Sequence, residues 1–222
     1  MSALPPEHHL PLDRVVEMRA AYLSGVSRGI PPNTHITINF REMRGRHAWP
    51  TDYHGATEEQ KASVTANCRD VIVASLRNWC RRQQPALPFA AVYVLENDPQ
   101  GGMGPHVHIL LHLPSTGYEE RARSLCGNVR KTMGWTTPAL KSKLLSLEAE
   151  RERPLLAGKP VNTVFLPFYL TSSKVTPGCP LSDAEQIIRL AYLAKGLRDT
   201  EVVTISGVTQ TIAQHIQQGA KS

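Results

Sequence analysis

The sequence predicts an α+β fold: a central antiparallel β-sheet with helices packed mainly on one face. Segments with the apolar spacing of amphipathic helices alternate along the chain with short segments rich in β-forming residues. Near the middle, two apolar segments, 89–96 and 106–113, flank the Gly- and Pro-rich segment 97–105, which is typical of a hairpin turn. A hairpin makes neighbouring strands antiparallel, and the sheet must then bury its apolar face against helices.

The remaining elements follow from the same patterns. Thr57 is a suitable N-cap for the longest helix, and Ser182 with Glu185 three residues later has the spacing of a capping box. The basic and aromatic segment 41–55 is expected to be an irregular loop. The expected helices cover 13–24, 58–83, 118–133, 141–153 (a charged helix or a connector) and a segment from Ser182 to about Gly196, with a weak helix near the C-terminus; the expected strands cover 34–40, 89–96, 106–113, 161–170 and 201–205.

We expect one main domain over residues 31–200, preceded by an extension over 1–30 with a short helix and followed by an extension over 201–222. The chain has 222 residues, which is enough for one domain with a sizeable core. It contains no apolar run of the roughly 18 residues that a membrane span needs. The N-terminal residues lack the basic and apolar regions of a secretory signal, so we expect a cytoplasmic protein without membrane contact.

The charge balance favours a polyanionic partner. Lys and Arg number 25 against 19 Asp and Glu, a formal net charge of +6, and the isoelectric point is near 9.3. Basic side chains bind phosphates and release counterions, so nucleic acid is a suitable partner. The four cysteines form no CxxC pair and lack zinc-finger spacing, which leaves buried free thiols as the expectation.

The segment 106–113 carries the strongest chemical signal. Alternate residues of a strand point to the same face, so His106 and His108 present two imidazoles side by side. If 89–96 pairs with 106–113 through the turn, Glu96 lies beside these histidines. A single histidine in an apolar strand is more often a core residue. An acid at the end of an apolar strand, however, needs a partner, because burying an unpaired charge is costly.

Two histidines and one carboxylate therefore predict a metal site formed by Glu96, His106 and His108. Such a set leaves coordination positions open for water or phosphate oxygens. It suits Mg²⁺ or Mn²⁺ acting on a phosphodiester.

The segment from Ile187 to Arg198 carries a second candidate. Arg189, Tyr192 and Lys195 are spaced three residues apart, so they face one side of a helix. A phenol between two cations is a plausible phosphate-facing nucleophile, because positive charge favours the phenolate. The alternative is an ordinary amphipathic helix with a tyrosine whose tip lies in water.

Taken together, these motifs resemble the rolling-circle replication initiators (Rep proteins) of plasmids and phages, in the HUH endonuclease superfamily. THITINF at 34–40 resembles the first strand of that family. LENDPQGGMGPHVHILLHLP at 95–114 resembles its acid, Gly-rich turn and His-hydrophobic-His pattern, and AYLAKG at 191–196 resembles its nucleophile helix. The resemblance implies an RRM-like core and an HUH-like endonuclease domain over 31–200.

The resemblance also implies a reaction. His106 and His108, with Glu96, would hold Mg²⁺ or Mn²⁺ against the scissile phosphate of single-stranded or hairpin origin DNA. Tyr192 would attack it and form a 5′-phosphotyrosyl link, with Lys195 steadying the phosphate. The tyrosine follows the histidines, and the sequence has no second tyrosine one helical turn from Tyr192. Both features resemble the single-tyrosine type of Rep protein. Unwinding would fall to a partner such as a host helicase, because no phosphate-binding P-loop is present.

Other interpretations remain open. A single-tyrosine transposase would use the same residues. In the endonuclease, the candidate DNA-binding residues are Arg41, Arg44, Arg46 and Arg189. A non-catalytic DNA-binding protein of the same fold would use two basic patches: Arg41, Arg44 and Arg46 with Trp49 and Tyr53, and a helix with Arg121, Arg123, Arg130 and Lys131. The strand also resembles the histidine-triad nucleotide hydrolases, but Leu110 stands where their third histidine is expected.

Overall fold

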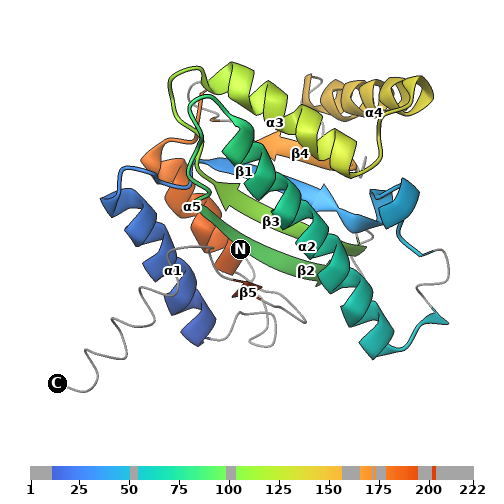
Figure 1. The fold of residues 1–222 in the computed structure, drawn as a ribbon, viewed down its shortest axis with the longest axis horizontal. Coiled ribbons are helices and arrows are strands. Elements are labelled where there is room, and N and C mark those ends of the chain that lie inside the picture. The colour runs from blue at the N-terminus through green and yellow to red at the C-terminus, as the bar shows by residue number, and fades with distance from the viewer. Residues whose placement is uncertain are drawn as a thin grey trace.

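The predicted α+β fold with a central antiparallel sheet is confirmed in the computed structural model (Figure 1). The structure describes residues 12–50, 55–98, 104–156, 166–171, 173, 179–194 and 202–203. Its helices are α1 (Leu12–Ser27), α2 (Glu58–Arg82), α3 (Tyr118–Thr132), α4 (Pro138–Leu156) and α5 (Asp183–Ala194); its strands are β1 (Thr34–Asn39), β2 (Ala91–Asp98), β3 (Gly104–Leu111), β4 (Phe168–Thr171) and β5 (Val202–Val203); two 3₁₀ turns, η2 (Phe40–Glu42) and η3 (Gly45–His47), follow β1.

The expected elements agree with these bounds, with differences at their ends. The segment 41–55, expected to be irregular, contains most of η2 and all of η3. The expected strand over 161–170 is represented by β4, and residues 161–165 lie outside the described part of the chain. The expected C-terminal helix lies outside it as well. Among the described helices, none is both long and apolar enough to cross a bilayer.

The sheet has the strand order β4-β1-β3-β2-β5, and every neighbouring pair is antiparallel. β2 and β3 form the predicted hairpin, in which Glu96 lies directly opposite His106 and Val94 opposite His108. β1 covers the other edge of β3, so that Thr37 also lies opposite His108. β3 is therefore the central strand, and its side chains are flanked on both sides.

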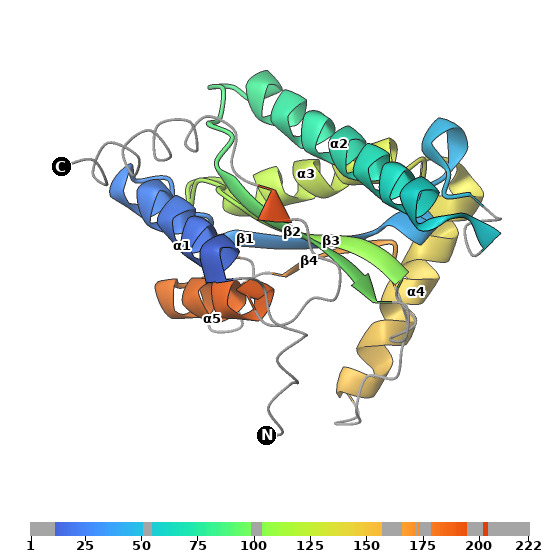
Figure 2. The same cartoon turned by 90° about the horizontal axis from the view of Figure 1, so that it is seen from below.

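Alternation along the strands separates the sheet into two different faces. Val107 and Ile109 of β3, with Ile36 and Ile38 of β1, belong to the larger apolar core. Residues of α2 and α3, such as Leu76 and Leu125, complete this core. Seen edge-on, α2 and α3 lie together on one side of the sheet (Figure 2).

The opposite face carries a smaller core and a polar strip. Met18 of α1 and Leu193 of α5 pack there with Val92, Val94 and Leu110, and Figure 2 shows α1 and α5 together on this side. Tyr22 of α1 donates a hydrogen bond of 2.8 Å to Gln186 of α5. The N-terminal helix thus packs on the sheet and also holds α5, the helix that carries Tyr192.

Capping residues fix where two helices begin. The Thr57 side chain accepts from the backbone N–H of Gln60, and the Gln60 side chain accepts from the backbone N–H of Thr57, which completes a capping box. At the start of α5, Glu185 accepts from the backbone N–H of Ser182 at 2.9 Å. These contacts confirm both predicted N-termini, including that of the tyrosine helix.

The end of α3 packs tightly against the turns that follow β1. Gly134 has φ of 78°, in the left-handed region that favours glycine. A Cβ placed on Gly134 would lie 2.8 Å from the carbonyl oxygen of Arg44. The Arg44 backbone N–H donates to the Met133 carbonyl at 2.9 Å, and the Trp135 indole donates to the Glu42 carbonyl at 2.6 Å. The backbone at Gly134 therefore packs directly on the backbone at Arg44, and there is no room for a side chain at residue 134.

Gly134→Ala should lower the free energy of unfolding by more than about 1 kcal/mol, because the new Cβ meets backbone and φ becomes unfavourable. The matched control is Gly127→Ala within α3, where nothing lies within 4 Å of the new Cβ. That variant should be more stable by roughly 0.5–1 kcal/mol, since glycine is a poor helix former. Urea unfolding of the two variants measures both changes. Equal stability of the Gly134 variant and wild type would contradict the close approach of α3 to the β1 turns.

Candidate metal centre

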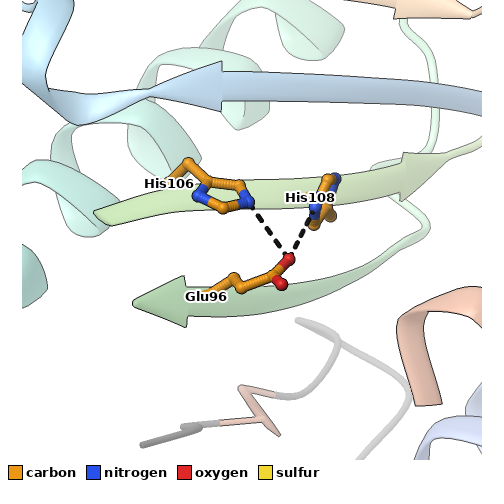
Figure 3. A group of neighbouring side chains, drawn as sticks. All are labelled: Glu96, His106 and His108. Carbon is orange, nitrogen blue, oxygen red and sulfur yellow. Dashed lines mark hydrogen bonds and ion pairs between the residues drawn. The ribbon is translucent and has the colours of Figure 1, made fainter. Parts of the chain in front are cut away.

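Glu96, His106 and His108 converge at one point on the polar face of the sheet (Figure 3). Glu96 Oε2 lies 3.1 Å from His106 Nε2 and 2.9 Å from His108 Nε2. One ligand atom from each residue lies within 4.8 Å of the others, so the three form a group that could hold a metal ion. The predicted pairing of the two strands through the Gly-rich turn is what brings the carboxylate to the imidazoles.

Charge and burial oppose each other at Glu96. Burial alone would raise the pKa of this carboxyl, but the hydrogen bonds to His106 and His108 outweigh it and hold the pKa at about 2. Glu96 is consequently an anion at neutral pH. Both imidazoles are almost fully buried, and burial lowers the pKa of His108 although its hydrogen bond to Glu96 opposes that effect.

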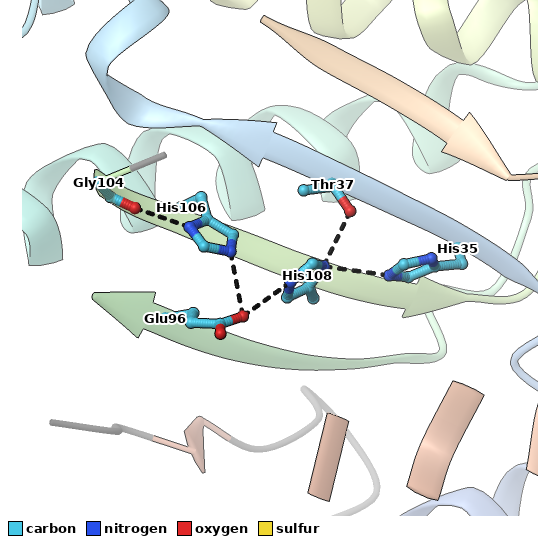
Figure 4. A network of polar contacts seen from close by, with 6 residues as sticks. All are labelled: His35, Thr37, Glu96, Gly104, His106 and His108. Carbon is cyan, nitrogen blue, oxygen red and sulfur yellow. Dashed lines mark hydrogen bonds and ion pairs between the residues drawn. The ribbon is translucent and has the colours of Figure 1, made fainter. Parts of the chain in front are cut away.

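The Gly104 carbonyl orients His106. This carbonyl lies 2.7 Å from His106 Nδ1, and because a carbonyl can only accept, Nδ1 carries the proton (Figure 4). The other ring nitrogen, Nε2, faces the Glu96 carboxylate and is the atom that a metal ion could bind. Gly104 has φ of 66°, and a Cβ there would run into the Arg41 side chain. The last glycine before the histidines thus fixes the direction of the first ligand.

His108 is supported by β1. Thr37 Oγ1 lies 2.8 Å from His108 Nδ1, and His35 Nε2 lies 3.3 Å from the same atom; Figure 4 shows both on the side away from Glu96. Burial, with the charges of His108 and Arg189, lowers the pKa of His35 to about 3, so His35 is neutral. The Nδ1 of His108 is held by partners, which leaves Nε2 pointing to Glu96.

The donor set fits a divalent cation. Two atoms bonded to one ion at about 2.1 Å lie roughly 3.0 Å apart at a right angle and roughly 3.4 Å apart at the tetrahedral angle. The observed separations of 2.9 and 3.1 Å approach the first value. In addition, a cation bound to His106 Nε2 and Glu96 Oε2 would take the place of the hydrogen that joins these two atoms in the cation-free protein.

Tyr192 lies beside this group. Its ring meets the His108 ring edge to face, with 5.5 Å between the ring centroids and an interplanar angle of 86°. Tyr192 is 48% exposed, so one side of the phenol packs on His108 while the rest is open to solvent. Tyr192, the predicted nucleophile, thus lies in contact with His108, one of the three predicted metal ligands.

The acidity of Tyr192 differs from the sequence-based expectation. Burial and the negative charge of Glu96 raise the pKa of the phenol, while Arg189 acts in the opposite direction. Without a bound cation, the negative charge of Glu96 disfavours the phenolate form of Tyr192. Arg189 is near enough for its charge to act on His35, His108 and Tyr192. Lys195, the other expected cation, lies outside the described residues.

The remaining basic candidates lie in the short segment that follows β1 and, for Arg189, in α5. Arg41 lies over Gly104, next to the turn that leads to His106. Arg44 binds the Glu42 carboxylate at 2.7 Å, and Arg46 follows in η3, where it contacts His47 at 2.9 Å. Arg44 also donates to the Arg41 carbonyl at 3.0 Å and lines one pocket with Arg46, whereas Arg189 lies near His108. Tyr53, the aromatic neighbour expected in this segment, lies outside the described residues.

Sequence reasoning missed the contribution of β1. The strand was expected, but no functional residue was drawn from it. Its polar residues His35, Thr37 and Asn39 alternate with apolar ones, which in a strand pairing with β3 is the signal for a polar strip beside His106 and His108. Tyr169 was also missed; it lies opposite Thr37 in the β1–β4 pair and near enough to Tyr192 to raise the pKa of that phenol.

The protein should bind one divalent ion at this group, and His106→Ala with His108→Ala should abolish that binding. Loss of an outer partner of a ligand already costs about 10- to 100-fold in metal affinity, so loss of two ligands must cost more. Titration calorimetry with Mn²⁺ measures it. His112→Gln is the matched control, because His112 lies on the same strand face but contacts the Pro31 carbonyl. Equal Mn²⁺ affinity in the double variant and the control would contradict the centre.

Thr37→Val should weaken Mn²⁺ binding by about 10- to 100-fold with a smaller loss of stability, because valine keeps the shape of threonine but removes the nearer of the two partners of His108 Nδ1. Thr34→Val at the other end of β1 is the control: Thr34 is equally buried but contacts Tyr118 and Asn33. Calorimetry on both variants separates the two effects. Similar Mn²⁺ affinities would assign Thr37 a structural role only.

Comparisons with protein-family models, with curated proteins and with solved structures found no match to this chain. The assignment of the centre accordingly stands on the geometry of its own residues. That geometry consists of the convergence of Glu96, His106 and His108, the support of both histidines through Nδ1, and the packing of Tyr192 on His108.

Proposed function

We propose that the protein is a metal-dependent enzyme that nicks and rejoins single-stranded DNA at a specific site through a covalent tyrosyl intermediate. One observation carries the proposal: Tyr192 packs on His108 of a His-His-Glu group, with 5.5 Å between the two rings. A nucleophile and a candidate metal group are therefore adjacent, although they lie on different elements. This is the combination that the resemblance to HUH endonucleases implies.

The chemistry follows from this arrangement. A divalent cation at the group would polarise the scissile phosphate and stabilise the charge that develops on its oxygens. The Tyr192 oxygen would attack phosphorus, and the bond from phosphorus to the 3′ oxygen would break. The phenol proton is balanced by the proton that the leaving 3′ hydroxyl gains. The product is a 5′-phosphotyrosyl link with a free 3′-OH, and the reverse attack by a 3′-OH rejoins the strand.

The chain's own residues prepare Tyr192 for this step. Burial and the charge of Glu96 raise the pKa of the phenol, and a cation bound beside the carboxylate would offset the second of these effects. Arg189 already acts in the favourable direction. Its position near both Tyr192 and His108 suits contact with the phosphate that the phenol attacks. A cation at the group would therefore favour the phenolate of Tyr192 in the same direction as Arg189.

We further propose that the cation is Mg²⁺ or Mn²⁺ and that the substrate is single-stranded or hairpin origin DNA of a plasmid or phage. In this role the protein starts rolling-circle replication, with Lys195 steadying the phosphate and a host helicase unwinding the duplex. A single-tyrosine transposase would use the same chemistry on the ends of a mobile element, and the sequence that is cleaved distinguishes the two.

Incubation with 5′- or 3′-labelled single-stranded oligonucleotides and Mn²⁺ should give a covalent protein–DNA adduct that denaturing gels resolve. Tyr192→Phe should abolish the adduct, because the variant lacks the attacking oxygen. Tyr169→Phe is the matched control, since this second phenol lies close enough to act on Tyr192. It should retain most of the activity. A chelator should stop the reaction of the wild type.

Other outcomes would change the proposal. An adduct that persists in Tyr192→Phe and disappears in Tyr169→Phe would move the nucleophile to β4. An adduct that survives both the chelator and the loss of His106 and His108 would exclude the metal mechanism. Binding without cleavage across a broad oligonucleotide pool would favour the non-catalytic DNA-binding alternative.

A further inference from the structure

A cationic pocket lies away from the metal group, on the other side of the sheet. Its volume is about 650 Å³, and it is lined by α2, α3, the residues that follow α3 and the turn η3. Four of its lining residues are the cations Arg44, Arg46, Arg82 and Lys131, and among the described residues that line it there is no carboxylate. His106 and His108 project from the opposite sheet face, whereas α2 and α3 cover the face of Val107 (Figure 2).

Neutral hydrogen-bonding side chains join the two helices at this pocket. Ser75 of α2 lies 2.5 Å from Thr132 of α3, and Asn128 donates to Ser75 at 2.9 Å. Arg82 in turn donates to Asn128 at 3.1 Å. These hydrogen bonds link α2 to α3 and hold the Arg82 side chain at the pocket.

The four cationic side chains are not equally available to bind an anion in the pocket. Arg44 is paired with Glu42 at 2.7 Å, so its charge is largely balanced. Arg46, Arg82 and Lys131 are exposed. Arg46 donates to the His47 ring and Arg82 to the Asn128 side chain, so neither of these bonds goes to a carboxylate. Like charges around one hollow repel each other, and an anion in the hollow relieves that repulsion.

We propose that this pocket binds phosphate groups, with Arg46, Arg82 and Lys131 on the phosphate oxygens and Asn128 toward the rest of the ligand. Its volume is in the range of roughly 300–1,000 Å³ that small-ligand sites occupy, and its composition matches the charge and the hydrogen-bonding capacity of a phosphate-bearing molecule. The phosphates come either from a free nucleotide or from a nucleic-acid backbone. The inference does not rest on strand cleavage, because it uses different residues on the opposite face.

The test compares two double variants with the same loss of charge. Arg82→Ala with Lys131→Ala removes two cations from the pocket. Arg81→Ala with Arg123→Ala removes two from the same helices at positions that do not line it. ATP and a labelled 20-base-pair DNA duplex are the two probes, and fluorescence anisotropy and calorimetry give the affinities. Thermal unfolding verifies that both variants are folded.

The pocket variant should bind at least one probe about tenfold more weakly than the matched variant, because charge-assisted hydrogen bonds to phosphate are lost. Weaker ATP binding with unchanged duplex binding identifies a nucleotide site. Weaker duplex binding, with a shallower dependence of affinity on salt, identifies a backbone site. Equal affinities of the two variants for both probes would overturn the proposal.

Discussion

The polar face of the sheet depends on one constraint: the Glu96 carboxylate is largely withdrawn from water and has to keep its charge. Burying an unpaired carboxylate costs several kcal/mol, and the usual response is to take up a proton. Here the hydrogen bonds to His106 and His108 are strong enough to lower the pKa of Glu96 to about 2 in spite of burial. The imidazoles are fixed in turn from behind, one by the Gly104 carbonyl and the other by Thr37.

This constraint explains why the sheet has two unlike faces. The larger core, between the sheet and the helices α2 and α3, supplies most of the apolar burial. The second face is apolar only where α1 and α5 pack on it, around residues such as Val94 and Leu110. The rest of that face carries buried polar groups, such as His106 and His108, whose hydrogen bonds compensate for their burial. Helix α5 ends its packing with Leu193, and the neighbouring Tyr192 reaches the edge of the polar strip.

Much of this architecture could be predicted from the sequence. The Gly-rich turn fixed the pairing of Glu96 with His106, since a hairpin of known ends leaves little choice of register. The capping boxes at Thr57 and Ser182 set two helix starts through short-range contacts. The hairpin register and the two helix N-termini depend on residues close in sequence, so hydrophobic periodicity and turn residues are sufficient to predict them.

Long-range features could not be obtained in the same way. Periodicity does not say which strand pairs with the free edge of β3, so the support that Thr37 and His35 give to His108 needed the register of β1. The raised pKa of Tyr192 depends on its burial and on its distance from Glu96, and the helix pattern alone contains neither. The cationic pocket joins η3 to α2 and α3, and the basic residues of these segments have no common pattern in the sequence.

The hydrogen bond from Tyr22 to Gln186 has a consequence for the timing of assembly. Glu96 is only 10 and 12 residues from His106 and His108, so the ligand group closes within a single hairpin. Tyr22 and Gln186 are 164 residues apart, and closing so large a loop costs more chain entropy. The ligands are therefore expected to be in place before the phenol arrives. Local opening of α5 would carry Tyr192 away while the ligand group stays intact, so metal occupancy and nucleophile position can vary independently.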